Sequence, residues 1–400
     1  MAHDWLEDFV AHTAYGEAPE KVMRWVGVAT IAGALRRKVF VDEDIFQWSP
    51  NFYLLIVAKP GVVKKSTSIG LGLRLLKKVD DIDFGPQMVT WQQMVTHMAG
   101  AREEITMPDG SPFEMSCCTI GLSEFGSFFK KDDDDMITQL TDMWDGKLET
   151  VVKETKTNGN DYIVNPWLNI MACCTPGWIT KNFSGSLIGE GFGSRPLYVH
   201  AETPTRFITS PRRNMMQQEM SPDIMKMEED MLVERLREFA QLAGEFHKTE
   251  EAFEWEEEWY PRYMAQLLQK PSEEASIGVR RQTHLNKVAM VLSVSRGKFP
   301  VIDVKEMQDA DAMLTELEED TKKVFGYVGQ SAITAAARDI VDILRKNGKM
   351  YRKDLYRNFF FRTMKAGDFD EAIKSAKAGG LLLEGGDLSN PVLEAIVLPA

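Results

Sequence analysis

Residues 52–67 set the tightest limit on the fold, because an apolar run there is followed at once by a lysine-rich turn and a helix-like stretch. The run Phe52–Ala58 reads FYLLIVA and has the continuous apolar character of a strand that is buried on both faces. The turn Lys59–Lys64 follows it, and helical periodicity begins at about Lys65. A buried strand, a short turn and a helix in this order predict an α/β fold with a parallel sheet covered on both faces.

The turn matches part of the phosphate-binding loop pattern G-x-x-x-x-G-K-[ST]. In that pattern backbone N–H groups at a helix N-terminus hold phosphates, the lysine reaches the β- and γ-phosphates, and the Ser or Thr hydroxyl ligates Mg²⁺. Lys65 and Ser66 occupy the Lys and Ser positions, but lysines 59 and 64 replace both glycines of the pattern. The alternative is an ordinary strand-to-helix turn with exposed lysines. We predict that ATP is bound by Gly61, Lys64, Lys65, Ser66 and Thr67.

Three further sites follow in the order that a P-loop ATPase needs. The apolar run Met115–Leu122 leads into Ser123 and Glu124, and we predict that Glu124 is the catalytic base and, with Ser66, holds Mg²⁺. Ser123 stands where such enzymes usually have Asp.

The apolar run Trp167–Cys174 ends at Thr175, a candidate sensor of the γ-phosphate. Arg195 follows a glycine-rich loop and is a candidate arginine finger for a neighbouring subunit, although a single Arg is usually a surface residue.

The chain of 400 residues is long enough for two or three units. We predict a helical cap at 1–45, an ATPase core at 46–216, a helical region at 217–328 and a winged-helix domain at 329–400. The winged-helix domain is predicted because three helical stretches are followed by two strands around a GGD turn. A winged helix can also serve protein contacts alone. The elements expected in the core are Phe52–Ala58, Ser66–Val79, Met88–Ala99, Met115–Leu122, Met136–Trp144, Trp167–Thr175 and Arg195–His200.

The composition and the charge of the chain limit where the protein is expected to act and what it is expected to bind. The start MAHDWLEDFVAH has acidic residues where a signal peptide is basic, and no apolar stretch is long enough to span a membrane, so we expect a cytoplasmic protein without a membrane partner. A net charge of −13 disfavours a surface coated for nucleic acid, although residues 331–400 carry 11 Lys and Arg against 9 Asp and Glu. The paired cysteines Cys117–Cys118 and Cys173–Cys174 lack the spacing of a zinc site and are expected to be buried, reduced thiols.

The whole series resembles a known family. The segments PNFYLLIVAKPGVVKKST, SEFGSFF with MWDGK, NPWLNIMACCTPGW and GFGSRPLYV resemble, in this order, phage- and prophage-encoded P-loop ATPases related to replicative helicases. The helix RRQTHLNKVAMVLSV, with Arg280, His284 and Lys287 on one face, is also similar to that family. The resemblance implies a RecA-like or AAA-type core, ATP and Mg²⁺ as cofactors, DNA as a partner and a homo-oligomeric ring, which we expect to be a hexamer. Arg280 or Arg281 is then a candidate second cation for the nucleotide.

These features favour an ATP-dependent replication helicase or DNA translocase of phage or mobile-element origin. A separate primase or replication initiator would then work with it, because no primase-like zinc motif is present. The alternative is a replication factor with weak or no ATPase activity, such as an origin-binding protein or helicase loader, that binds DNA through its winged helix. A purely regulatory DNA-binding protein is a third reading. The lost loop glycines favour the alternatives, whereas Lys65, Ser66 and Glu124 favour the enzyme.

Overall fold

The computed structural model describes residues 4–86, 90–130, 133–146, 150–155, 159–183, 191–217, 221–325, 332–361, 364–387 and 391–396. The chain forms two compact units, Met1–Gly326 and Tyr327–Ala400. Each unit has its own hydrophobic core, and each is therefore described by itself.

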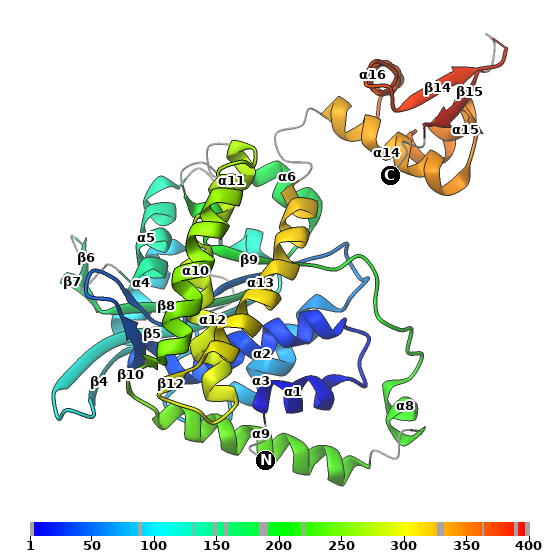
Figure 1. Cartoon of the computed structure of the whole chain (residues 1–400). Coiled ribbons are helices and arrows are strands. Elements are labelled where there is room, and N and C mark those ends of the chain that lie inside the picture. Colours follow the sequence, from blue (N-terminus) through cyan, green and yellow to red (C-terminus); the bar gives the residue numbers. More distant parts are fainter. Residues whose placement is uncertain are drawn as a thin grey trace. The chain divides into compact units, whose positions relative to one another are not determined.

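A five-stranded sheet lies at the centre of the first unit (Figure 1). Its strands, in spatial order, are β4 (Arg102–Thr106), β5 (Pro112–Leu122), β8 (Pro166–Cys174), β3 (Tyr53–Val57) and β9 (Pro196–His200). Strands β5, β8, β3 and β9 are parallel, and β4 pairs with β5 in the antiparallel direction. The predicted α/β fold with a largely parallel sheet is confirmed, whereas the antiparallel edge strand β4 was not predicted.

Helices cover both faces of this sheet. On one face lie α2 (Glu20–Leu35) and α3 (Lys65–Leu76). The Asn169 side chain of β8 donates to the Ala29 carbonyl of α2 (2.9 Å), and a Cβ added at Gly121 of β5 would lie 2.1 Å from Leu73 of α3. On the other face lie α4 (Trp91–Gly100) and α5 (Asp134–Asp145), where the Tyr53 hydroxyl of β3 donates to the Leu140 carbonyl (2.8 Å). Close packing of this kind explains why the strands are apolar on both faces.

The N-terminal helices and the charged helical region share the core of the sheet. Trp5 donates from Nε1 to the Leu232 carbonyl (2.9 Å), and the Leu6 backbone N–H donates to Ser295 Oγ (2.8 Å). The regions predicted at 1–45, 46–216 and 217–328 are therefore one compact unit up to about residue 326. Its other described helices are α1 (Trp5–Thr13), α6 (Pro176–Asn182), α8 (Pro211–Gln217), α9 (Pro222–Gln241), α10 (Glu250–Leu267), α11 (Ser272–Gly278), α12 (Arg281–Ser295) and α13 (Val304–Phe325).

Several short strands lie outside the central sheet. Strand β1 (Val39–Asp42) joins β2 (Gln47–Trp48) and β10 (Gly244–Glu245), and β11 (His247–Lys248) pairs with β12 (Val301–Ile302). A hairpin of β6 (Thr150–Thr155) and β7 (Gly159–Val164) precedes β8. These strands were not predicted; four of them, β2, β10, β11 and β12, have only two residues each and carry too little apolar pattern to be distinguished from loops.

The second unit combines three helices with a three-stranded antiparallel sheet. The helices are α14 (Ala332–Asn347), α15 (Arg352–Leu355), which continues as a π-helical turn over Tyr356–Phe360, and α16 (Ala366–Ala378). The strands, in spatial order, are β13 (Met350–Tyr351), β15 (Val392–Ala395) and β14 (Leu382–Gly385). The three helical stretches and the hairpin predicted for this region are present, and β13 is an addition.

The two cysteine pairs are buried, as predicted, but they are not neighbours. Strands β5 and β8 are adjacent, and Cys118 lies opposite Leu168, whereas Cys173 and Cys174 lie at the other end of β8. The register therefore offsets the two pairs along the strand direction, although their strands are adjacent.

In the described part of the chain, no helix has both the length and the apolar character needed to cross a membrane.

Candidate functional site at the carboxyl edge of the sheet

Three of the predicted elements end side by side at the carboxyl edge of the parallel strands. Val57 at the end of β3 lies opposite Cys174 at the end of β8, and Leu122 at the end of β5 lies opposite Ala172 of the same strand. Because β8 lies between β3 and β5, Thr175 follows a strand flanked by the lysine-rich loop and by Glu124. In open parallel sheets, ligands bind outside this edge. The structure thus brings the loop, Thr175 and Glu124 together.

The lysine-rich loop has a turn geometry that glycine normally provides. Gly61 has φ of 75°, and Lys64, at the N-cap of α3, has φ of 51° and ψ of 40°. Lys64 holds the second glycine position of the phosphate-loop pattern, so the backbone keeps the left-handed conformation although the glycine is lost. The loop therefore places the N-terminus of the twelve-residue helix α3 at the carboxyl edge of the sheet.

The side chains of the loop are placed to meet a phosphate. The Lys65 ammonium donates to the Ala58 carbonyl at the end of β3 and is partly exposed. Ser66 and Thr67 are exposed in the first turn of α3. Lys64 is 54% exposed and its ammonium lies 3.8 Å from a Glu17 carboxylate oxygen. A phosphate can take the Lys65 ammonium from a neutral carbonyl at little cost, because the carbonyl is a weaker partner than an anion.

Lys65 and Glu124 act on the same buried thiols. Burial raises the pKa of Cys173 to about 12, the positive charge of Lys65 lowers that pKa, and the negative charge of Glu124 raises it. The pKa of Cys174 is likewise raised, first by burial, with the same two opposing charges beside it. The strand order likewise places both residues beside the end of β8, because Lys65 follows β3 and Glu124 follows β5.

Glu124 and Thr175 differ in how they are held. Glu124 is exposed in extended backbone directly after β5, and among the described residues no hydrogen bond or ion pair of its carboxylate is found. Thr175 is the N-cap of α6, and its hydroxyl oxygen accepts from the Trp178 N–H (3.2 Å). Its hydroxyl proton remains able to donate to an anion. Ser123 is exposed beside Glu124.

The donor set fits a hard divalent cation bound together with a nucleotide. The Ser66 hydroxyl and the Glu124 carboxylate are both exposed oxygen ligands, and Mg²⁺ in nucleotide sites is usually held by one or two protein oxygens, phosphates and water. These residues would hold the ion, whose role is to neutralise charge on the phosphates.

Arg195 and Arg280 lie at the opposite edge of the sheet. Pro196 pairs with Tyr53, the first residue of β3, so Arg195 lies where the parallel strands begin. The five residues of β3 at about 3.3 Å each separate the two edges by roughly 17 Å. Arg280 lies with Arg195, because one of its nitrogens is 3.6 Å from an Asp145 oxygen. Neither arginine can therefore reach the candidate site at the carboxyl edge of the same chain.

The Arg195 side chain is buried in an ion pair. It is 3% exposed, and it donates through Nε (3.1 Å) and Nη2 (2.8 Å) to the two carboxylate oxygens of Asp145. A third bond goes to the Gly191 carbonyl. In this conformation Asp145 at the end of α5 holds the guanidinium in place, and its action on a neighbouring subunit stays a prediction. Residues 184–190 of that loop, Gly189 among them, lie outside the described residues.

His284 and Lys287 complete what we call the amino-edge cluster, defined as Trp144, Asp145, Arg195, Arg280, His284 and Lys287. The Lys287 ammonium donates to Asn51 Oδ1 (2.6 Å) and to the Trp144 carbonyl (2.8 Å), and it lies 3.7 Å from the centre of the Trp144 ring. Burial lowers the pKa of Lys287 well below its ordinary value. Burial, followed by the charge of Lys287, lowers the pKa of His284 to about 3. The three residues placed on one face of the helix in the sequence therefore do meet.

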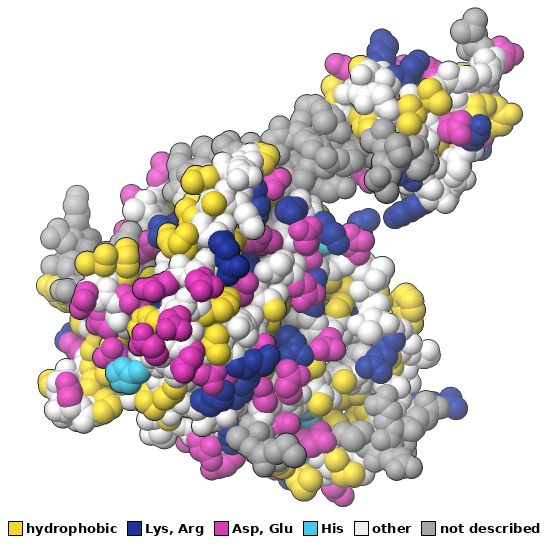
Figure 2. Space-filling model, in the orientation of Figure 1, with side chains coloured by type: hydrophobic (Ala, Val, Ile, Leu, Met, Phe, Trp, Pro, Cys, Tyr) yellow, Lys and Arg dark blue, Asp and Glu magenta, His cyan; other side chains and the backbone are white. Residues whose placement is uncertain are grey.

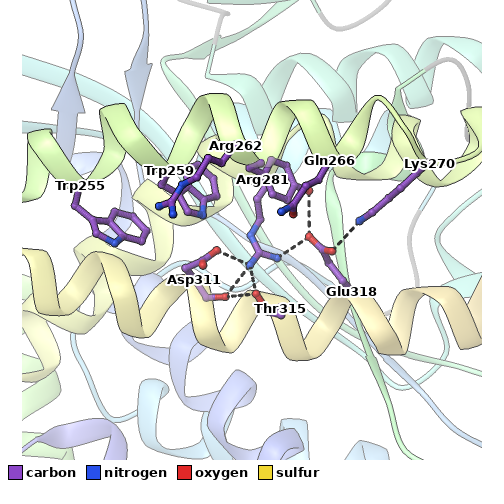
Figure 3. A pocket seen from close by; sticks show the side chains of 10 residues that line it. Trp255, Trp259, Arg262, Gln266, Lys270, Arg281, Asp311, Thr315 and Glu318 are labelled. Carbon is purple, nitrogen blue, oxygen red and sulfur yellow. Dashed lines mark hydrogen bonds and ion pairs between the residues drawn. The ribbon is translucent and has the colours of Figure 1, made fainter.

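Arg281 is a structural residue. It is 5% exposed and donates to Glu318, Asp311 and Thr315 of α13 at 2.7–3.0 Å, as Figure 3 shows. The expectation that Arg281 offers a cation to a nucleotide is wrong, because its guanidinium is already paired with two carboxylates of α13. It lines a pocket of about 430 Å³ formed by Trp255, Trp259, Arg262, Tyr263, Gln266, Lys270, Arg281, Asp311, Thr315 and Glu318.

Sequence reasoning missed Asp145 and Asn51, the partners that hold Arg195 and Lys287. Asp145 lies in the segment MWDGK, but nothing local shows that an acid there faces an arginine 50 residues later. No family model matches the chain, and no curated protein matches it. The resemblance to phage P-loop ATPases therefore stays a prediction.

Proposed function

We propose that the protein binds ATP with Mg²⁺ at the carboxyl edge of the central sheet and hydrolyses it. The observation that carries this proposal is the position of β8 between β3 and β5, which aligns Lys65, Thr175 and Glu124 on three adjacent strand ends. A strand order that placed β5 elsewhere would separate the base from the phosphate loop. The likeness in motif order adds a RecA-like or AAA-type core to the proposal.

Each residue then has a distinct task. The N–H groups at the start of α3 and the Lys65 ammonium hold the β- and γ-phosphates. Ser66 and Glu124 hold Mg²⁺ through oxygen, and the exposed Glu124 carboxylate orients water toward the γ-phosphorus and accepts its proton. The Thr175 hydroxyl donates to a γ-phosphate oxygen and loses this partner when phosphate leaves. Charge stabilisation and positioning account for most of the catalysis in this class of reaction.

Two variants test the assignment. Lys65→Ala should abolish productive ATP binding, whereas Lys64→Ala and the control Lys59→Ala, both exposed lysines of the same loop, should have smaller effects. Glu124→Gln should bind ATP and turn it over at least ~10²-fold more slowly, the usual scale for losing a positioned base. Binding is followed by titration with ATP and Mg²⁺, and turnover by phosphate release. Unchanged turnover in Glu124→Gln would refute the role of Glu124.

We further propose that ATP turnover drives movement on DNA in a homo-oligomeric ring. The arginines of the amino-edge cluster are too far from the proposed nucleotide site of their own subunit, so they can act in turnover only at a neighbour's site, and Arg195 must first leave Asp145 to do so. Of the two, Arg280 is the more accessible, with its side chain 35% exposed. Exposed glutamates dominate α10 (Figure 2), so DNA would not track over that face.

Mixing two inactive variants tests the trans arrangement. Arg195→Ala should lower turnover by ~10³-fold if the guanidinium serves a neighbour, and mixing it with Glu124→Gln should restore part of the activity. Asp145→Ala is the matched control, since it breaks the same ion pair but keeps the guanidinium. Equal losses in the two variants, with no recovery on mixing, would make Arg195 a structural residue only.

A replication factor with little or no ATPase activity is the second candidate, favoured by the lysines at both glycine positions of the loop. DNA would then bind through the second unit, whose three helices and hairpin follow the order of a winged helix. The exposed face of α16 carries Lys374 and Lys377 but also Asp368 and Glu371. ATP turnover with and without single-stranded DNA separates the candidates: turnover stimulated by DNA favours the translocase, and DNA binding without turnover favours the factor.

A further inference from the structure

Three side chains of different metal-binding type converge on one face of β5, away from the nucleotide site. They are Asp83, His97 and Cys118, and one ligand atom of each lies within 4.8 Å of the other two. The His97 Nε2 atom is 2.6 Å from Asp83 Oδ2. Cys118 lies four residues before the end of β5, which is roughly 13 Å along the strand, and Glu124 follows two residues beyond that end. The cluster is therefore separate from the proposed ATP site.

The backbone around the cluster fixes all three positions. Asp83 belongs to a short segment that bridges to β5 in the parallel direction, where the Thr119 N–H donates to the Asp83 carbonyl and the Gly85 N–H to the Thr119 carbonyl, both at 3.0 Å. A Cβ at Gly85 would lie 3.1 Å from the Cys118 sulfur, so glycine allows the segment to lie close to the thiol. His97 lies in the last turn of α4, whose N-terminus is closed by a capping box.

The chemistry of the three donors selects a particular kind of ion. A thiolate, an imidazole and a carboxylate together suit Zn²⁺ and Co²⁺, whereas Mg²⁺ and Ca²⁺ prefer oxygen ligands alone. Cys118 is buried, but the side chains of His97 and Asp83 are 32% and 37% exposed. A three-ligand site that is open on one side leaves the fourth tetrahedral position to water.

We propose that Asp83, His97 and Cys118 form a Zn²⁺ site with water as the fourth ligand, which fastens the segment 83–85 and α4 to β5. The ion binds the thiolate, so the proton of the Cys118 thiol is released to solvent on binding. Without an ion, Asp83 pairs with His97 and the protonated Cys118 thiol donates a hydrogen bond to Asp83, whereas the ion binds Cys118 as the thiolate. This difference decides the experiment.

The test uses the full chain and Zn²⁺ or Co²⁺ alone. Wild-type protein is expected to bind one Zn²⁺ per chain, and Co²⁺ should give the absorption bands of a tetrahedral ion with a thiolate ligand. Cys118→Ala should remove the thiolate band and weaken Zn²⁺ binding at least about tenfold. Cys117→Ala, the neighbouring buried thiol, is the matched control and should change neither. His97→Ala should weaken Zn²⁺ binding in the same way, and it tests the site even if Cys118→Ala does not fold. His247→Ala, which changes an exposed histidine, is its control and should bind Zn²⁺ as the wild type does.

Two results would overturn the proposal. One is Zn²⁺ binding that is equal in wild type and in His97→Ala, which would show adventitious binding only. The other is a Co²⁺ spectrum of the wild type without the thiolate band. Neither result bears on the ATPase, since ATP turnover is no part of the measurement.

Discussion

Lys64 adopts a backbone conformation that L-residues rarely take, with φ of 51°. The left-handed region costs a non-glycine residue about 1–2 kcal/mol, whereas glycine adopts it without a steric penalty. Its ammonium lies 3.8 Å from Glu17 and is more than half exposed, so this contact contributes little. The lysine is thus retained at the cost of local strain.

We expect Lys64→Gly to stabilise the protein. Relief of strain of about 1–2 kcal/mol exceeds the extra entropy that glycine gives the unfolded chain, about 0.4–1 kcal/mol, so the net gain should be roughly 0.5–1 kcal/mol. Urea denaturation of both proteins measures it. Lys59→Gly is the control, because Lys59 is exposed in the same loop but has no positive φ, and it should be neutral or destabilising. A loss of stability in Lys64→Gly would contradict the strained geometry.

His284 should make the protein less stable in mild acid. Its pKa is lowered to about 3, mainly by burial and then by Lys287, whereas in the unfolded chain it is about 6.5. Between these values the unfolded state binds more protons, so stability rises with pH and is lost as pH falls from about 6.5 toward 3. From pH 6.5 to pH 5 the contribution is about 2 kcal/mol.

Urea denaturation at several pH values measures this effect as a slope. His284→Gln should flatten the loss of stability between pH 6.5 and 5, whatever its effect on stability at pH 7. His247→Gln, which changes an exposed histidine, should keep the wild-type slope. The same slope in all three proteins would show that His284 does not titrate in this window.

One buried guanidinium makes several of the polar contacts between helices α12 and α13. Arg281 donates to Asp311, Thr315 and Glu318, and its guanidinium lies 5.7 Å from the centre of the Tyr263 ring of α10 (Figure 3). Breaking a buried ion pair costs about 3–5 kcal/mol. Both carboxylates here keep 27% exposure and can be solvated when the cation is lost, so a smaller cost is expected.

Arg281→Ala should therefore lower the free energy of unfolding by about 2–3 kcal/mol. Arg262→Ala, at the exposed rim of the same pocket, should change it by less than about 0.5 kcal/mol. Both are measured by urea denaturation at pH 7. Similar values for the two variants would mean that the bridge between α12 and α13 does not stabilise the unit.

The whole molecule is built from two separately cored units, which predicts independent folding. The buried residues of 336–393 form a cluster of their own, distinct from the core that runs from Trp5 to Leu317. A chain ending at residue 326 should melt within about 3 °C of the main transition of the full protein and bind ATP equally well. Residues 327–400 alone should fold with marginal stability, as small domains do. Circular dichroism melting curves test the folding of both fragments, and ATP titration tests binding by the first. Loss of folded structure in the fragment that ends at residue 326 would show that the core of the first unit depends on the second unit.

Much of the candidate site could be predicted from local sequence. The strand β3, the loop and α3 were found because an apolar run, a turn and helical periodicity are properties of neighbouring residues. Glu124 and Thr175 were found because each directly follows a buried strand, and parallel strands present their ends at one edge. The helices of the second unit were found because Gly348 and Gly379–Gly380 mark where they stop.

The tertiary structure alone decided which of these pieces meet. The register between β3 and β9 placed Arg195 at the edge opposite the loop. There it lies beside Asp145, although 50 residues separate the two in the chain. It also brought Asp83, His97 and Cys118 together from a bridge segment, a helix and a strand. Apolar pattern determines that a strand is buried but not which strand lies beside it, because the order of strands depends on how distant segments pack. The sequence by itself therefore determined the residues that we propose for phosphate binding, and the packing of the sheet decided that Lys65, Thr175 and Glu124 share an edge while the arginines do not.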